Sequence, residues 1–192
     1  LSSKDSLKIL KETNALQEGH FILSSGLHSD KYIQCAQLLS KPGKARKICN
    51  SLSKKIKENF KKIDLILSPA IGGIVIGYEI GRLLGIETIF AERKDKNFEL
   101  SRGFELKKGQ KILIIEDVIT TGKSSLECSS LVIKAQAKVI GYACIIDRSN
   151  GKSNIKEKII SQLKMEIRTY KKENLPNHLK KIKPIKPGSR KI

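Results

Sequence analysis

Apolar side chains recur at helical spacing in two stretches near the start of the chain. Leu7 and Leu10 follow Ser2, whose side chain can cap a helix, so the first stretch predicts a helix that ends at about Glu18. The second stretch follows Pro42, and its apolar residues recur every three or four positions: Ala45, Ile48, Leu52, Ile56 and Phe60. Lysines fill the positions between them, which is typical of a helix that packs on a sheet and exposes its other face to water.

The stretch between these two helices has a different pattern. From Phe21 to Gln34, short apolar segments lie on either side of Ser25 and Gly26. Extended segments joined in this way are typical of a β-hairpin. We therefore expect a hairpin, or hood, that precedes the main body of the fold.

From Asp64 onward, short apolar runs alternate with helical segments bounded by glycines. Strands are expected at residues 65–67, 87–91, 111–115 and 139–146, and helices at 74–84 and 122–135. This alternation predicts an α/β fold with a mostly parallel central sheet flanked by helices. Ligands of open parallel sheets bind beyond the carboxyl ends of the strands, so the site is expected in the loops after Leu67, Ala91, Ile115 and Ile146.

The length and composition restrict the class of protein. A chain of 192 residues fits a single domain over residues 1–192. The longest apolar runs are broken by Asp64, Pro69 and paired glycines, so no membrane-spanning helix is expected. Residues 1–11 lack the cleavage site of a secretory signal, which favours a cytoplasmic protein. The four cysteines have no C-x-x-C spacing and are expected to be buried free thiols.

The charge is strongly positive, with a formal net value of +19. Clustered basic residues often bind nucleic acid, but here lysines are spread along the chain without interleaved aromatic residues that stack on bases. We therefore expect no specific nucleic-acid partner. A small anionic substrate matches a positive field better, and a solvated lysine-rich surface is the alternative.

The segment from Ile112 to Ser125 carries the most specific chemistry in the sequence. A buried strand ends in Glu116 and Asp117, and a turn with hydroxyls and a glycine then opens a helix. Backbone N–H groups and the helix N-terminus favour a phosphate, while the carboxylates accept hydrogen bonds from ribose hydroxyls. An ordinary capped turn is the alternative. The predicted phosphate cradle consists of Val118, Ile119, Thr120, Thr121, Gly122, Lys123 and Ser124.

This segment resembles the phosphoribosyl-pyrophosphate (PRPP) binding motif of type I phosphoribosyltransferases. The resemblance implies their fold, with a hood formed mainly by residues 1–40 and the C-terminal segment, and a core at about residues 41–170. It also implies that Glu116 and Asp117 hold the ribose hydroxyls and act catalytically, because carboxylates stabilise positive charge that develops on the sugar.

The segment Gly19–Gln34 resembles the hood of the orotate phosphoribosyltransferase family, with its G-x-F-x-L-x-S-G pattern. The resemblance implies that an arginine after the last expected strand, Arg148, binds the orotate carboxylate with its two-pronged guanidinium. A polar hairpin cover and a surface salt bridge are the respective alternatives. The residues expected to bind orotate are Thr120, Arg148, Ser25, His28 and Tyr32, with Ser29 beside them.

Two further loops complete the expected PRPP site. The turn at residues 68–73 resembles the family's pyrophosphate loop, where Gly72 and Gly73 let backbone amides approach the anion; an ordinary turn is the alternative. Residues 91–103 stand where many orotate enzymes carry a mobile loop with a histidine, which this chain lacks. Arg93 and Lys94 are the cations expected to act on the leaving pyrophosphate.

The resemblance implies a complete reaction and its partners. PRPP and orotate would give orotidine 5'-phosphate and pyrophosphate, in pyrimidine nucleotide synthesis. Mg²⁺ is expected as the cofactor, held mainly by PRPP and water with no direct protein ligand. A homodimer is implied by the family. The alternatives are a purine or uracil phosphoribosyltransferase, which would share only the PRPP cradle, and a regulator of this fold that binds nucleic acid.

Overall fold

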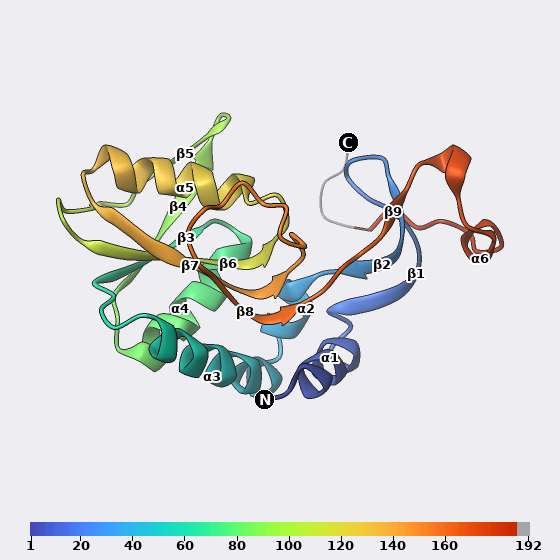
Figure 1. The fold of residues 1–192 in the computed structure, drawn as a ribbon, viewed down its shortest axis with the longest axis horizontal. Coiled ribbons are helices and arrows are strands. Elements are labelled where there is room, and N and C mark those ends of the chain that lie inside the picture. The colour runs from blue at the N-terminus through green and yellow to red at the C-terminus, as the bar shows by residue number, and fades with distance from the viewer. Residues whose placement is uncertain (188–192) are drawn as a thin grey trace.

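The computed structural model describes residues 1–187 and consists of a six-stranded core sheet with helices on both faces and a hood at one end (Figure 1). The strand order is β5-β4-β3-β6-β7-β8, and all neighbouring strands are parallel except β4 and β5. The α/β fold with a mostly parallel sheet is therefore confirmed. The core strands are β3 (Leu65–Pro69), β4 (Thr88–Lys94), β5 (Asn97–Glu99), β6 (Lys111–Ile119), β7 (Lys138–Asp147) and β8 (Ile159–Lys164).

Three helices cover the core sheet. Helices α3 (Pro42–Asn59) and α4 (Gly72–Leu84) lie on one face, and α5 (Lys123–Lys134) lies on the other (Figure 1). Strand β6 is buried on both sides: Leu113 belongs to the apolar cluster on the α3 and α4 side, and Ile114 belongs to the cluster beneath α5. Neighbouring strand residues point to opposite faces, so a continuous apolar run fills both layers.

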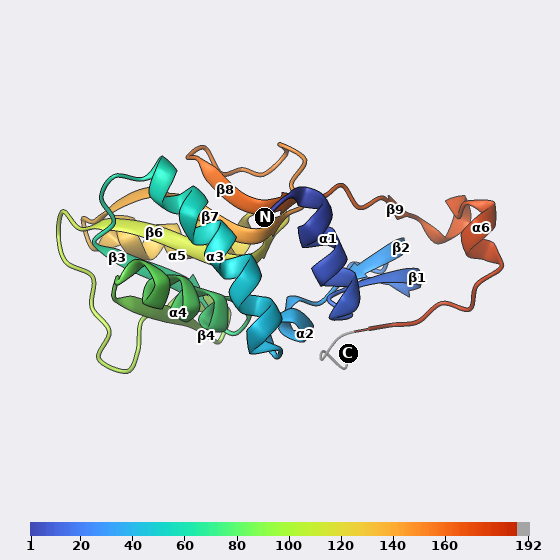
Figure 2. The same ribbon diagram turned by 90° about the horizontal axis from the view of Figure 1, so that it is seen from below.

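The hood is built from both ends of the chain. Strands β1 (Leu16–Ile22) and β2 (His28–Ile33) form the expected hairpin, and β9 (Thr169–Tyr170) adds to β2. After β9 the chain turns back through an outlying loop and pairs with β1 through Ile185 (Figure 2). The remaining elements are α1 (Ser3–Glu12), α2 (Cys35–Leu39), the 3-10 helix η1 (Lys172–Asn174) and α6 (Asn177–Lys180).

The first helix is shorter than predicted. Ser2 caps it as expected, but it ends at Glu12 rather than near Glu18. Asn14 adopts a left-handed backbone conformation, with φ of 58°, which a helix does not continue through. Leu16, expected on this helix, instead begins β1.

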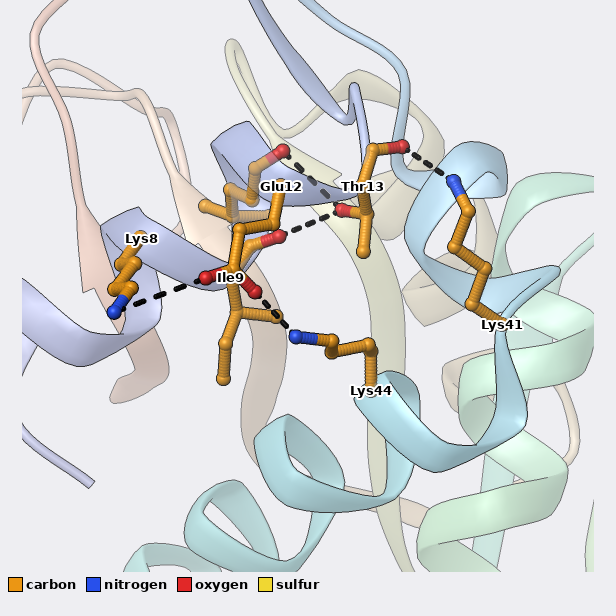
Figure 3. A network of polar contacts seen from close by, with 7 residues as sticks. Lys8, Ile9, Glu12, Thr13, Lys41 and Lys44 are labelled. Carbon is orange, nitrogen blue, oxygen red and sulfur yellow. Dashed lines mark hydrogen bonds and ion pairs between the residues drawn. The ribbon is translucent and has the colours of Figure 1, made fainter.

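A polar network fastens the end of α1 to the start of α3 (Figure 3). The Lys41 ammonium donates to the Thr13 carbonyl at 2.8 Å, and the Thr13 hydroxyl donates to the Ile9 carbonyl at 2.8 Å. Glu12 forms ion pairs with Lys8 and with Lys44 of α3. These contacts join the hood to the core. The hydrophobic patterns of α1 and α3, taken one at a time, do not predict this connection.

Three strands of the core differ most from the prediction, and one of them, β5, was not among the expected strands. Strand β6 runs to Ile119 instead of ending at Ile115, because β7 pairs with it as far as Asp147. Strand β8 was not expected at all. Its Gln162 is buried, and the amide donates to the Ser6 hydroxyl of α1 at 2.8 Å, a polar partner that is distant in sequence.

Other expectations about the chain agree with the structure. The four cysteines are buried free thiols. Among residues 1–187, no helix is long and apolar enough to cross a membrane.

Helix α4 packs closely on the sheet because Gly77 and Gly81 have no side chain where the helix meets β3 and β4. A Cβ atom on Gly81 would lie 2.0 Å from the Thr88 hydroxyl and 2.8 Å from the Ile86 carbonyl oxygen. We predict that Gly81→Ala lowers the free energy of unfolding by about 1–3 kcal/mol through this overlap. Gly43→Ala in α3 is the control, because a Cβ there meets no atom within 4 Å. Urea unfolding measures both, and equal stabilities for the two variants would contradict this packing.

Candidate active site

A cavity of about 870 Å³ lies between the ends of β6 and β7 and the hood. The core contributes the acidic strand end, the threonine turn and the arginine after β7, whereas the hood contributes its hairpin and the C-terminal segment. Residues far apart in sequence therefore meet in one site. It is lined by Leu23, Ser24, Ser25, Tyr32, Ile33, Gln34, Asp117, Val118, Thr120, Thr121, Arg148, Thr169, Lys186 and Pro187.

The turn between β6 and α5 has the shape that a phosphate cradle requires. Gly122 has φ of 79°, and a Cβ atom there would lie 2.8 Å from the Ile155 side chain, so glycine fits this position best. No side chain caps the N-terminus of α5, which begins at Lys123. The Lys123 N–H makes a long hydrogen bond of 3.4 Å to the Thr121 hydroxyl, and no N-cap side chain satisfies the N–H groups that follow it. These groups lie next to the hydroxyls of Thr120 and Thr121 and favour an anion.

Asp117 is the carboxylate of the cavity. Burial raises the pKa of Asp117, although its Oδ1 accepts a hydrogen bond from the Val118 N–H at 2.9 Å. The start of α4 lies directly against it, because a Cβ atom on Gly72 would be 2.9 Å from Asp117 Oδ1. Gly73 is equally restricted: its Cβ atom would lie 3.0 Å from the Ile115 carbonyl oxygen. The two loops expected to bind PRPP are thus brought together.

Glu116 has a different environment from its neighbour. Adjacent strand residues point to opposite faces, and Glu116 accepts a hydrogen bond from the Ser125 hydroxyl in the first turn of α5. Burial raises the pKa of Glu116 to about 7, and the nearby Asp117 carboxylate adds to the effect. Glu116 does not line the cavity, so the structure does not bring the two acids to one ligand as expected.

Arg148 lies at the cavity wall after β7. Its backbone N–H donates to the Ile119 carbonyl at 2.8 Å, which holds it beside the threonine turn. Its Nε atom is buried without a hydrogen-bond partner among the described residues, and burial lowers the pKa of the guanidinium. A buried donor without a partner is energetically costly, and an anion in the cavity would satisfy it.

The hood residues expected to bind the base divide into two groups. Ser25 and Tyr32 line the cavity, but His28 and Ser29 do not. His28 is buried against His20, and the Ser29 hydroxyl donates to the Arg168 carbonyl at 2.9 Å. The interpretation of His28 as a base-binding residue is therefore corrected, because the C-terminal part of the chain covers that end of β2.

Arg93 and Lys94 lie at the end of β4, outside the cavity lining. The Arg93 guanidinium donates to Glu127 of α5 and to the Lys96 carbonyl, both at 2.5 Å, and lies 4.3 Å from the Phe98 ring centroid. Within one chain, Arg93 is therefore held by α5 and the β4–β5 hairpin, outside the cavity lining.

The structure also adds residues that the sequence did not indicate. Ser24 and Gln34 belong to the hood segment and could have been found from its polar positions. Thr169 and Lys186 lie in the C-terminal part, which has no periodic pattern from which to place them.

The raised pKa of Glu116 has a measurable effect on stability. Its ordinary value is 4.5, so between about pH 4.5 and pH 7 the folded protein holds a proton that the unfolded chain releases. The free energy of unfolding should fall as pH rises through this window. We predict that Glu116→Gln stabilises the protein more at about pH 8 than at about pH 5. Urea unfolding at both pH values tests this, and an effect independent of pH would contradict it.

Comparison with known proteins agrees with this geometry. The family model described as phosphoribosyl transferase domain matches residues 36–180. An orotate phosphoribosyltransferase of Parvibaculum lavamentivorans is 44% identical over 192 residues, which cover 98% of this chain and 99% of the relative. One from Rhizorhabdus wittichii is 42% identical over 191 residues, or 99% and 97% of the two chains.

A solved structure has the same fold. Orotate phosphoribosyltransferase from Aeropyrum pernix superposes with a TM-score of 0.70 at 20% identity, over 82% of this chain and 92% of that one. The family resemblance of the acidic strand, the threonine turn and the hood therefore extends over nearly the full length of this chain. The chain belongs to the orotate phosphoribosyltransferases, within the phosphoribosyl transferase domain family.

Proposed function

We propose that this chain transfers the phosphoribosyl group of PRPP to orotate, as its family membership indicates, within pyrimidine nucleotide synthesis. N1 of orotate gives up its proton to solvent and forms a bond with the anomeric carbon, and the bond from that carbon to pyrophosphate breaks. Pyrophosphate leaves with the electron pair. The observation that carries the proposal is the single cavity that holds Asp117, the threonine turn, Arg148 and the hood residues Ser25 and Tyr32.

The PRPP half of the site would use the ends of two helices. The 5-phosphate would bind at residues 118–124, where the N–H groups at the start of α5 lack a side-chain cap. Pyrophosphate would lie at Gly72 and Gly73, since α4 also begins without a side-chain cap. These two N-termini flank Asp117, so the ribose would lie between them.

Asp117 would bind the ribose and stabilise the reaction electrostatically. Positive charge develops on the sugar ring as pyrophosphate departs, and a buried carboxylate interacts with such charge more strongly than one in water. Glu116 would stabilise the phosphate-binding turn indirectly, through its hydrogen bond with Ser125 in the first turn of α5. For Glu116 to bind the ribose directly, its side chain would have to break the hydrogen bond with Ser125.

The orotate half would use groups from both core and hood. Arg148 can form paired hydrogen bonds with the carboxylate, and this would satisfy its buried Nε. Tyr32 offers an aromatic face, and Ser25 and Thr120 offer hydroxyls to a flat ring. This combination supports orotate over purines or uracil, which lack the carboxylate.

Mg²⁺ is the cofactor that the chemistry favours. Within the described residues, no group of three or more His, Cys, Asp or Glu side chains forms a metal site. The donors present fit a cation held mainly by the substrate, with Asp117 as the nearby carboxylate. The ion would neutralise pyrophosphate charge that Gly72 and Gly73 alone leave uncompensated.

We also propose that the protein works in the cytoplasm. Its four cysteines are buried and unpaired, whereas disulfides are typical of oxidising compartments. Pyrimidine nucleotide synthesis uses soluble phosphorylated intermediates, which is consistent with this location.

An assay of pyrophosphate release with PRPP and Mg²⁺ tests the function. Orotate should support turnover, whereas uracil and hypoxanthine should not. We predict that Asp117→Asn lowers kcat at least about 100-fold, because it removes the charge beside the sugar, with little change in unfolding temperature. Glu58→Gln, an exposed charge removal on α3, is the control and should keep full activity. Turnover with uracil or hypoxanthine but not orotate would refute the function.

A homodimer would complete the site. Ile71, Val75 and Tyr78 are 86%, 52% and 66% exposed and follow one face at the start of α4, next to the glycines assigned to pyrophosphate. A second copy would cover this apolar face, and its Arg93 and Lys94 would reach the site from the β4–β5 hairpin. Single exposed apolar residues are ordinary, but three adjacent ones favour an interface.

We predict that Tyr78→Glu converts the dimer to a monomer, because it places a charge within the apolar contact. Light scattering during size-exclusion chromatography measures the mass. Ile133→Glu is the matched control, since Ile133 is 67% exposed on α5, away from this face. A wild-type protein that is monomeric at working concentration, or a Tyr78→Glu variant that stays dimeric, would contradict the proposed interface.

A further inference from the structure

The C-terminal segment, residues 182–187, returns along the hood (Figure 2). Its Lys186 lines the substrate cavity. Backbone hydrogen bonds fix its position: Ile22 donates to the Ile185 carbonyl, and Ile185 donates to the His20 carbonyl, each at 2.8 Å. The preceding helix α6 is anchored by Leu179, which is fully buried. Lys186 is therefore placed by regular strand-like pairing next to β1.

A buried histidine pair strengthens this attachment. His20 Nδ1 lies 2.8 Å from the Ile182 carbonyl oxygen, and His20 Nε2 lies 2.7 Å from His28 Nδ1. A carbonyl only accepts, so His20 Nδ1 carries the hydrogen of the first bond; with neutral rings, His28 Nδ1 then donates to His20 Nε2. Both rings are almost completely buried. The network explains why His28 is directed at His20, which in turn contacts the C-terminal segment.

Lys186 changes the charge of the cavity. The other charged residues of its lining are Asp117 and Arg148, which both extend from the core sheet. Lys186 comes from the opposite wall, and it follows Ile185, whose partner Ile22 leads directly into Leu23 and Ser24 of the lining. A cation thus stands on the hood side of the cavity, whereas the turn assigned to the 5-phosphate belongs to the core.

We propose that Lys186 is a substrate-binding residue that sets specificity for a carboxylated pyrimidine. Its ammonium binds the carboxylate of the base from the hood side, while Arg148 binds it from the core side. This inference rests on the proposed transfer to orotate. Orotate carries a carboxylate that uracil lacks, and a second cation stabilises the anionic base without affecting a neutral one.

The length and flexibility of lysine suit this position. Arg148 is partly buried and held by its backbone bond to Ile119, so its guanidinium has a restricted direction. Lys186 is exposed, and its four-carbon stem can follow the base as it enters and leaves. The segment that carries it therefore forms part of the binding site, in addition to closing the hood.

The test compares Lys186→Met with Lys183→Met. Methionine keeps most of the stem and removes the charge, and Lys183 is an exposed lysine of the same segment outside the cavity lining. Lys186→Met should raise KM for orotate about tenfold or more, with KM for PRPP and the unfolding temperature little changed. Lys183→Met should leave KM for orotate at the wild-type value, and Lys186→Arg should restore most of the loss.

The outcomes separate this inference from the proposed function. If wild type uses orotate and Lys186→Met leaves its KM unchanged, or raises only KM for PRPP, Lys186 is not a carboxylate ligand although the activity stands. An equal rise in KM for orotate from Lys183→Met would assign the effect to general surface charge and overturn the inference. If wild type shows no turnover with orotate, the proposed function fails, and the inference fails with it.

Discussion

The parallel pairing of β6 with β7 is the constraint on which the rest of the site depends. It extends β6 past the apolar run to Ile119, whereas β3 pairs with β6 only as far as Ile114, so the pairing with β7 holds the segment that carries the acidic residues. Because strand neighbours face opposite ways, Asp117 is directed at the cavity and Glu116 at helix α5. The same pairing brings Arg148 beside Ile119, so one rigid element positions the carboxylate, the phosphate turn and the arginine.

The opposite wall of the cavity has a different origin. The hood joins the first forty residues to the last described ones, through β2 with β9 and through Ile185 with His20 and Ile22. Neither end of the chain forms this wall alone. The core side of the cavity therefore holds its charged groups in fixed positions, as catalysis requires. Its hood side is held in place by segments near both ends of the chain.

Most of the core was predictable from the sequence because its elements follow strong local patterns. The helix after Pro42 and the strand with Leu113 and Ile114 are confirmed, and the phosphate turn stands where its glycine and hydroxyls indicate. The errors involve contacts that are distant in sequence. His20, which contacts His28, is bonded to Ile182 in the C-terminal segment, and the partner of Gln162 in β8 lies on α1. Lys186 reaches the cavity only because the chain returns along the hood.

The central claim is that the turn after β6 holds the 5-phosphate of a ribose whose hydroxyls face Asp117. A crystal structure of the protein with PRPP and Mg²⁺ tests it directly. The phosphate oxygens should lie within hydrogen-bonding distance, about 3 Å, of N–H groups in residues 121–124, with a ribose hydroxyl equally close to Asp117. A PRPP molecule bound elsewhere, with this turn unoccupied, would contradict the account.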